Sequence, residues 1–88
     1  MNILIDRRFE KDTDKIRDRN LLIKLADIIE QVRNSPNFES IHNFKKMQGS
    51  NNYYRIRIGD YRIGIILSGN TVTFIRFLHR KEIYRVFP

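Results

Sequence analysis

The sequence predicts an α+β fold in which an N-terminal strand and a helical hairpin precede a mostly antiparallel sheet of three to four strands with a short C-terminal segment. Two patterns support this prediction. Apolar residues recur at helical spacing between residues 21 and 32, and they alternate with polar residues between residues 53 and 67. A length of 88 residues favours one compact domain, so residues 1–88 are expected to fold as a single unit.

The first half of the chain contains a predicted strand and two predicted helices. Residues 3–5 form a short apolar run that charge follows at once, as in a strand. Residues 9–19 have a thin apolar stripe, and the helix after them ends before Pro36, because proline lacks a donor and disfavours helical geometry in the residue before it. The wide stripe of this second helix comprises Leu21, Leu22, Leu25, Ile28, Ile29 and Val32, and it is expected to face Ile56, Ile63, Ile65 and Phe74.

The second half is expected to supply the sheet. Polar and apolar residues alternate through residues 53–58 and again through residues 61–67, on either side of the turn signal Gly59-Asp60. A period of two is typical of strands that bury one face. Three neighbouring segments complete the prediction: residues 44–47 as a short strand or extended lead-in, residues 71–78 as a third long strand, and residues 79–87 as a helical turn or tail.

The turn at Gly59-Asp60 determines how the two strands pair, because a two-residue loop fixes the register of a hairpin. Arg57 is expected directly opposite Arg62, and Arg55 opposite Gly64, which is expected to leave room for a ligand. Like charges opposite each other destabilise a sheet, so folding alone gives no reason for this pair. Arginine can hold two phosphate oxygens with its planar fork. The cluster therefore predicts an anion site, the alternative being arginines splayed into solvent.

Positive charge gathers in the second half of the chain. The formal net charge is +7. Residues 1–39 contain eight basic and eight acidic side chains, whereas residues 40–88 contain nine basic side chains and only Asp60 and Glu82 as acids. A one-sided positive field attracts polyanions through steering and counterion release. The alternative is a solvated basic face that serves solubility.

Composition excludes several classes of protein. The chain has no cysteine, so it has no disulfide framework, thiolate nucleophile or cysteine-based zinc site. Its two histidines lie far apart in sequence without clustered carboxylates, and it has neither a phosphate-binding glycine loop nor a nucleophile elbow. No apolar run is long enough for a signal peptide or a membrane span. We therefore expect a cytoplasmic protein with no cofactor, no metal and no membrane partner.

Two further groups near the arginines are candidates for a site. In a regular antiparallel register His79 would share a face with Arg62, where it could donate a proton or bind phosphate. The rings of Tyr53, Tyr54 and Tyr61 could form a stacking surface for bases. Alternation, however, puts Tyr54 and Tyr61 on the predicted core face, which weakens the stacking interpretation.

Three stretches of the second half together resemble the RelE/ParE toxin superfamily. They are Lys46-Met47-Gln48-Gly49, the run YRIRIGDYRI at residues 54–63, and HRKEIYR at residues 79–85. The order of strand, helical hairpin and sheet agrees with that superfamily as well. The resemblance implies the toxin of a bacterial type II toxin–antitoxin pair. It further implies a RelE-like endoribonuclease that cuts messenger RNA on the ribosome, in the decoding site, without a metal.

The resemblance also assigns roles to individual residues. In RelE toxins the 2′-hydroxyl of the cut nucleotide attacks its own phosphate, which gives a cyclic phosphate and a free 5′-hydroxyl. Arg62 matches a phosphate-binding arginine, Arg80 matches the basic residue that protonates the leaving group, and Tyr84 matches an aromatic residue that stacks on or orients the substrate. The expected catalytic residues are Arg57, Arg62, Arg80 and Tyr84, and the expected substrate-binding residues are Arg55, Lys46 and His79.

The chain departs from the RelE pattern in its strand arginines. That pattern has lysines at the positions of Arg55 and Arg57, and an arginine almost never gives up its proton. Both are therefore expected to stabilise charge on the phosphate. The role of general base would then fall to Tyr84, His79 or water, and the spacing from Arg80 to Tyr84 is shorter than in the pattern.

Partners and alternatives follow from the same resemblance. The expected partners are an acidic antitoxin, the messenger RNA and the ribosome with its 16S rRNA. A disordered segment of the antitoxin is expected to fold onto the Arg57/Arg62 face or to displace the C-terminal segment. One alternative is a ParE-like non-catalytic inhibitor of DNA gyrase, although ParE toxins generally lack the arginine cluster and closing tyrosine. Another is a non-catalytic RNA- or DNA-binding module.

Overall fold

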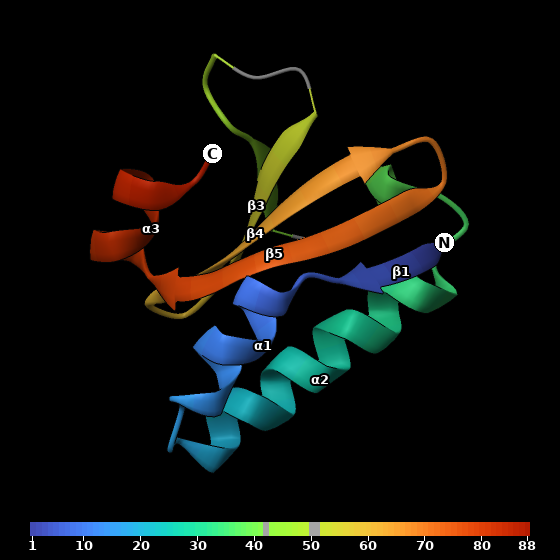
Figure 1. The fold of residues 1–88 in the computed structure, drawn as a ribbon. Coiled ribbons are helices and arrows are strands. Elements are labelled where there is room, and N and C mark those ends of the chain that lie inside the picture. Colours follow the sequence, from blue (N-terminus) through green and yellow to red (C-terminus); the bar gives the residue numbers. More distant parts are fainter. Residues whose placement is uncertain (42, 50–51) are drawn as a thin grey trace.

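The computed structural model describes residues 1–41, 43–49 and 52–88. Its helices and strands follow the predicted order along the chain (Figure 1). In chain order they are β1 (Asn2–Ile5), α1 (Arg7–Asp14), α2 (Arg19–Asn34), a short 3-10 helix η1 (Phe38–Ser40), β2 (Phe44–Lys46), β3 (Tyr53–Ile58), β4 (Tyr61–Ser68), β5 (Thr71–His79) and α3 (Arg80–Val86).

Within the described residues the strands form one five-stranded mixed sheet in the order β1-β5-β4-β3-β2. β1 runs parallel to β5, and the other neighbouring strands are antiparallel. The α+β prediction is confirmed, but the sheet is larger than the three to four strands expected. It gains a strand because the N-terminal strand joins it as one edge, while β2 forms the other edge.

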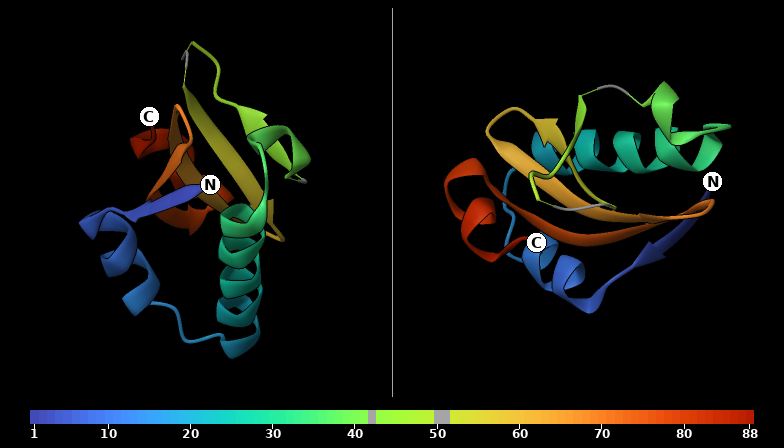
Figure 2. Two further views of the ribbon diagram at one scale, coloured as in Figure 1. Left: turned by 90° about the vertical axis from the view of Figure 1, so that its right-hand side faces the viewer. Right: turned by 90° about the horizontal axis from the view of Figure 1, so that it is seen from above.

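The sheet is covered on both sides. α2 lies across one face, α1 packs against β5, and α3 lies on the opposite side (Figure 2). The apolar stripe of α2 meets the predicted strand residues in a main core, except that Leu22, which was expected to face the strands, does not belong to this core. This main core includes Leu21, Leu25, Ile28, Ile29 and Val32 from α2 and Ile56, Ile63, Ile65 and Phe74 from the strands. A smaller second core on the α3 side consists of Met47, Ile75, Ile83 and Phe87.

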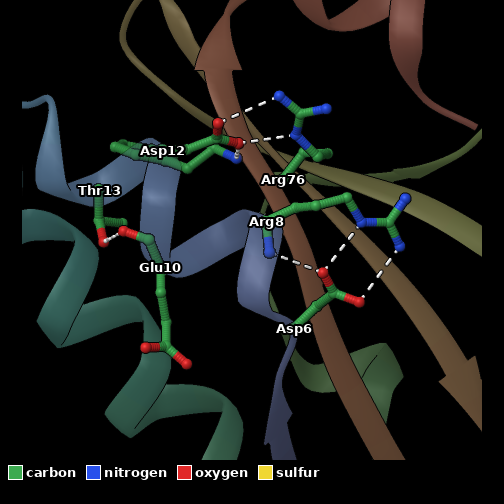
Figure 3. Close-up of polar contacts among 7 residues, drawn as sticks. Asp6, Arg8, Glu10, Asp12, Thr13 and Arg76 are labelled. Atoms are coloured by element: carbon green, nitrogen blue, oxygen red, sulfur yellow. Dashed lines mark hydrogen bonds and ion pairs between the residues drawn. The ribbon is translucent and has the colours of Figure 1, made fainter.

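Each helix of the hairpin starts at an aspartate. The Asp6 carboxylate accepts a hydrogen bond from the backbone N–H of Arg8 at 2.8 Å, and the Asp18 carboxylate accepts one from the backbone N–H of Leu21 at 3.2 Å. Such caps satisfy backbone donors that have no partner within the first helical turn. Hydrogen bonds from the Arg8 side chain and backbone hold the pKa of the Asp6 carboxyl below its usual value, which keeps this cap ionised (Figure 3).

A buried carboxylate joins α1 to the edge of β5. β1 pairs with β5 only as far as Phe74, so among the described residues the β5 backbone beyond Phe74 has no strand neighbour on this side. Asp12 fills the gap: its carboxylate accepts the backbone N–H of Phe77 at 2.9 Å and two hydrogen bonds from Arg76 at 2.8 and 3.1 Å (Figure 3). The Asp12 side chain is only 4% exposed. It thus replaces a strand partner at an otherwise open sheet edge.

The β4–β5 pair contains an irregularity that changes which side chains share a face. Ile65 pairs with Phe74, but the preceding Gly64 pairs with Arg76, so Ile75 is an extra residue in β5. An extra residue of this kind is a β-bulge, which shifts the register of everything beyond it by one position. The bulge therefore decides on which face of the sheet His79 lies, at the end of β5.

Candidate functional site

The arginine pair lies on the face of the sheet that α2 does not cover. Arg57 is paired with Arg62, and Arg55 with Gly64, so the register predicted from the two-residue turn is confirmed. The neighbouring Ile56 belongs to the main core on the other face. Arg57 is exposed and Arg55 is half-buried. Two of the three strand arginines are therefore open to a ligand.

Arg62 is held inside the protein. Its residue is 8% exposed, and its Nη1 donates hydrogen bonds to the carbonyl oxygens of Gly59 and Tyr61, each at 2.9 Å. Its Nε is buried and has no hydrogen-bond partner among the described residues. These contacts tie the β3–β4 turn together, so removing the Arg62 side chain would lose them as well as relieve its repulsion with Arg57.

An open groove of about 760 Å³ lies beside the strand arginines. It brings together three residues that the sequence analysis selected as site residues: Lys46, Arg55 and Tyr84. Tyr84 lies on α3 and is 54% exposed. The remaining lining residues are Lys45, Met47, Gln48, Gly49, Phe87 and Pro88. The groove combines cations with apolar and aromatic surface, which suits a nucleotide that has both a phosphate and a base.

Lys45 is a groove residue that the sequence analysis missed. It lies directly opposite Arg55 in the β2–β3 pair, whereas Lys46 lies opposite Tyr54, a residue packed against the main core. Lys45 therefore shares the arginine face. In a strand, successive side chains of residues 44–46 point to alternate faces, and this alternation could have placed Lys45 beside Arg55. The sequence alone, however, did not decide whether this segment was a strand.

Gly64 has a different role from the one expected. A Cβ built at this position would lie 2.7 Å from a ring atom of Phe87, well inside van der Waals contact. Phe87 is buried and its ring also stacks on Tyr53, with ring centroids 5.4 Å apart. The absent side chain therefore makes room for the chain's own C-terminal phenylalanine, and the expectation that it admits a ligand backbone is wrong.

Replacing Gly64 with alanine should lower the free energy of unfolding by about 1–3 kcal/mol, because the added methyl group overpacks the Phe87 ring. Urea denaturation would measure this loss. The matched control is Gly64→Ala in a Phe87→Ala background, where the obstructing ring is gone and the further loss should be small. Equal losses in both backgrounds would show that Phe87 is not what restricts this position.

His79 lies on the opposite face from the one predicted. The β5 bulge pairs His79 with Tyr61, and the two rings meet edge to face with centroids 5.6 Å apart. The His79 Nδ1 accepts the backbone N–H of Lys81 at 3.1 Å and thereby caps α3. The expectation that His79 shares a face with Arg62 is therefore wrong, and the histidine is part of the start of α3.

The two site residues of α3 lie four positions apart, which puts them on one side of the helix. Arg80 is the first residue of α3, and its side chain is 55% exposed. Its Nε lies 3.9 Å from an Asp60 carboxylate oxygen. Tyr84 lines the groove, whereas Arg80 lies beside the β3–β4 turn. The arrangement extends the basic surface from the groove to that turn.

The cations around the groove have no carboxylate partner among the residues that the structure describes. The ion pairs found among the described residues are Arg8–Asp6, Arg33–Glu30, Arg76–Asp12 and the long Arg80–Asp60 contact. Lys45, Lys46, Arg55 and Arg57 are absent from that set. Within the described part of the chain no cluster of three or more histidine or acidic side chains could hold a metal ion. None of its helices is long and apolar enough to cross a membrane.

The protein is of a class that has a small mixed sheet with a basic groove beside its C-terminal helix. Comparison with known proteins identifies this class. The family model described as "ParE toxin of type II toxin-antitoxin system, parDE" matches residues 3–84. The chain belongs to this family and is a toxin of the RelE/ParE superfamily, as the resemblance implied.

Individual relatives agree with this assignment. The chain is 42% identical over 89 residues to "Toxin RelE3" of Methanocaldococcus jannaschii, with 100% of both sequences covered. It is also similar to a chain in the crystal structure of a RelB-RelE antitoxin-toxin complex from Methanococcus jannaschii, with a TM-score of 0.83, 41% identity, and 97% and 99% of the two chains covered. The archaeal RelE-RelB complex from Pyrococcus horikoshii shares the fold, with a TM-score of 0.73 at 15% identity over 92% and 96% of the chains.

Proposed function

We propose that this toxin is a metal-independent endoribonuclease that cleaves messenger RNA on the ribosome. One observation carries the proposal: the groove gathers Lys45, Lys46, Arg55 and Tyr84 next to the exposed Arg57. These cations form no ion pair with a carboxylate in the described part of the chain, so they can attract a phosphate backbone, and the exposed tyrosine ring offers a surface on which a base can stack. The similarity to proteins named as RelE toxins supports a toxin of the RelE type.

In the proposed reaction the 2′-hydroxyl oxygen of one nucleotide forms a bond to the adjacent phosphorus while the bond to the 5′-oxygen breaks. The products are a 2′,3′-cyclic phosphate and a free 5′-hydroxyl. Arg55 and Arg57, which are open to a ligand, act on the phosphate, where positive charge offsets the charge that develops in the transition state. Arg62 is buried, and it adds its positive charge from inside the protein. Arg80 offsets the negative charge that develops on the departing 5′-oxygen, which takes a proton from water to become the free hydroxyl. Lys46 contributes to binding of the RNA backbone.

We assign the proton acceptor to Tyr84 or a water molecule in the groove. Arg55 and Arg57 stay protonated at any working pH and cannot take the proton. His79 packs on Tyr61 on the other face of the sheet and uses its Nδ1 to cap α3, which argues against the role considered for it. Tyr84 has an exposed hydroxyl-bearing side chain in the groove.

The proposed partner that restrains the toxin is an acidic antitoxin. Two of the similar solved structures are complexes of RelE with RelB, and one of them is described as an antitoxin-toxin complex. The excess charge of +7 lies entirely in the second half of this chain. A disordered acidic segment that folds on this surface would neutralise the charge and cover the groove.

A second candidate function is inhibition of DNA gyrase, which the match to the ParE family model favours. This function needs a binding surface but no chemistry. Both functions use the basic face, so electrostatics alone does not separate them. The products formed in cells do separate them, because one toxin cuts transcripts and the other traps gyrase on DNA.

Inducing the wild-type protein in cells should generate new transcript 5′ ends within translated regions and no excess of gyrase–DNA complexes. Arg57→Ala should weaken these cuts because it removes an exposed cation of the site. Arg17→Ala is the matched control, since Arg17 is also an exposed arginine, lies in the loop between α1 and α2, and its loss should leave the cuts unchanged. Intact transcripts together with trapped gyrase would contradict the nuclease and support the second candidate.

A further inference from the structure

The tight turn between β3 and β4 contacts two of the proposed catalytic arginines at once. On one side, the Gly59 and Tyr61 carbonyls accept the Nη1 group of Arg62, both at 2.9 Å. On the other side, the Asp60 carbonyl accepts the backbone N–H of Arg80 at 2.8 Å. Three successive carbonyls of one turn therefore hold residues that lie on different elements, β4 and α3.

Asp60 adds a side-chain contact to this arrangement. One of its carboxylate oxygens lies 3.9 Å from the Arg80 Nε. Asp60 and Glu82 are the only acids among residues 40–88, and Asp60 is the one found in an ion pair with a site residue. A carboxylate placed among cations in a site that binds phosphate would weaken binding unless it served another purpose. That purpose is suggested by the residue it contacts.

We propose that Asp60 is a positioning residue that orients the Arg80 guanidinium toward the departing oxygen, with the β3–β4 turn as the common anchor of Arg80 and Arg62. This inference rests on the proposed nuclease function. A long, half-exposed arginine has many rotamers, and restricting them before substrate arrives lowers the entropy lost in reaching the transition state. Asp60 itself does not touch the reacting atoms.

The strength of the contact sets the expected effect. Both side chains are largely exposed, at 55% for Arg80 and 71% for Asp60. Exposed ion pairs are weak, so loss of this one should reduce the cleavage rate no more than about fivefold. Asparagine is well tolerated in turns, and Asp60→Asn should therefore leave the hairpin folded.

The experiment measures kcat and KM for cleavage of messenger RNA on programmed ribosomes. Asp60→Asn should lower kcat by up to about fivefold with little change in KM, and Asp60→Glu should retain much of the wild-type rate because it keeps the charge. In an Arg80→Ala background, Asp60→Asn should have no further effect. Glu82→Gln is the matched control, because it removes the other exposed acid of the second half and should leave kcat unchanged.

A second readout distinguishes failure of this inference from failure of the nuclease function. Nuclear magnetic relaxation of the Arg80 Nε–H reports the order of the guanidinium without any substrate. Asp60→Asn should lower its order parameter, and Glu82→Gln should not. Unchanged order, or an equal loss of kcat with and without Arg80, would overturn the positioning role. If the wild-type protein cuts nothing, the nuclease function fails, and the relaxation result still decides whether Asp60 positions Arg80.

Discussion

Replacing Arg80 with alanine should lower the rate of messenger RNA cleavage about a hundredfold, because a positioned charge that stabilises a transition state typically contributes at least that much. The free energy of unfolding should hardly change. The Arg80 side chain is 55% exposed, and its contact with Asp60 is long. Its backbone N–H bond to the turn does not depend on the side chain. Cleavage kinetics on ribosomes and urea denaturation measure the two quantities separately.

Lys81→Ala is the matched control for this prediction, since it removes the neighbouring exposed cation of α3. A control that lost as much activity as Arg80→Ala would show that general charge, rather than Arg80, is responsible. Arg62→Ala tests catalysis less specifically than Arg80→Ala does, because it also affects stability. It would also lose two hydrogen bonds to the turn and a buried side chain, and its free energy of unfolding should fall by about 1–3 kcal/mol.

Replacing Asp12 with alanine should produce the largest loss of stability, about 3 kcal/mol. Removing one partner of a buried pair leaves the other charge uncompensated, and the figure is kept toward the lower end of the usual 3–5 kcal/mol because the Arg76 side chain is 22% exposed. The backbone N–H of Phe77 would lose its acceptor as well. Urea or thermal denaturation measures this change.

Asp14→Ala is the matched control, because Asp14 lies on the same helix two residues later and is exposed. Its loss should change stability by less than about 0.5 kcal/mol, as for most surface substitutions. A double-mutant cycle of Asp12→Ala with Arg76→Ala would measure the pair itself. Independent, additive effects of the two substitutions would contradict a joint role at the β5 edge.

The sequence by itself determined the parts of the structure that depend on local patterns. The helical stripe identified α2 and its buried face, because apolar residues at helical spacing can be buried on one side only. The two-residue turn determined that Arg57 pairs with Arg62, because so short a loop permits one register. The motif around these arginines also indicated the toxin superfamily.

Only the tertiary structure decided which face of the sheet some of these residues occupy and which distant residues they contact. One extra residue, Ile75, moved His79 to the face of Tyr61, and nothing in the local alternation marks that insertion. The C-terminal Phe87 fills the space at Gly64, and the carboxylate of Asp12 meets Arg76 from 64 residues away. Periodicity and turn length act between neighbours along the chain. The β5 bulge, the packing of Phe87 at Gly64 and the buried Asp12–Arg76 pair depend instead on which distant segments pack together. Such contacts between distant segments exist only in the folded molecule.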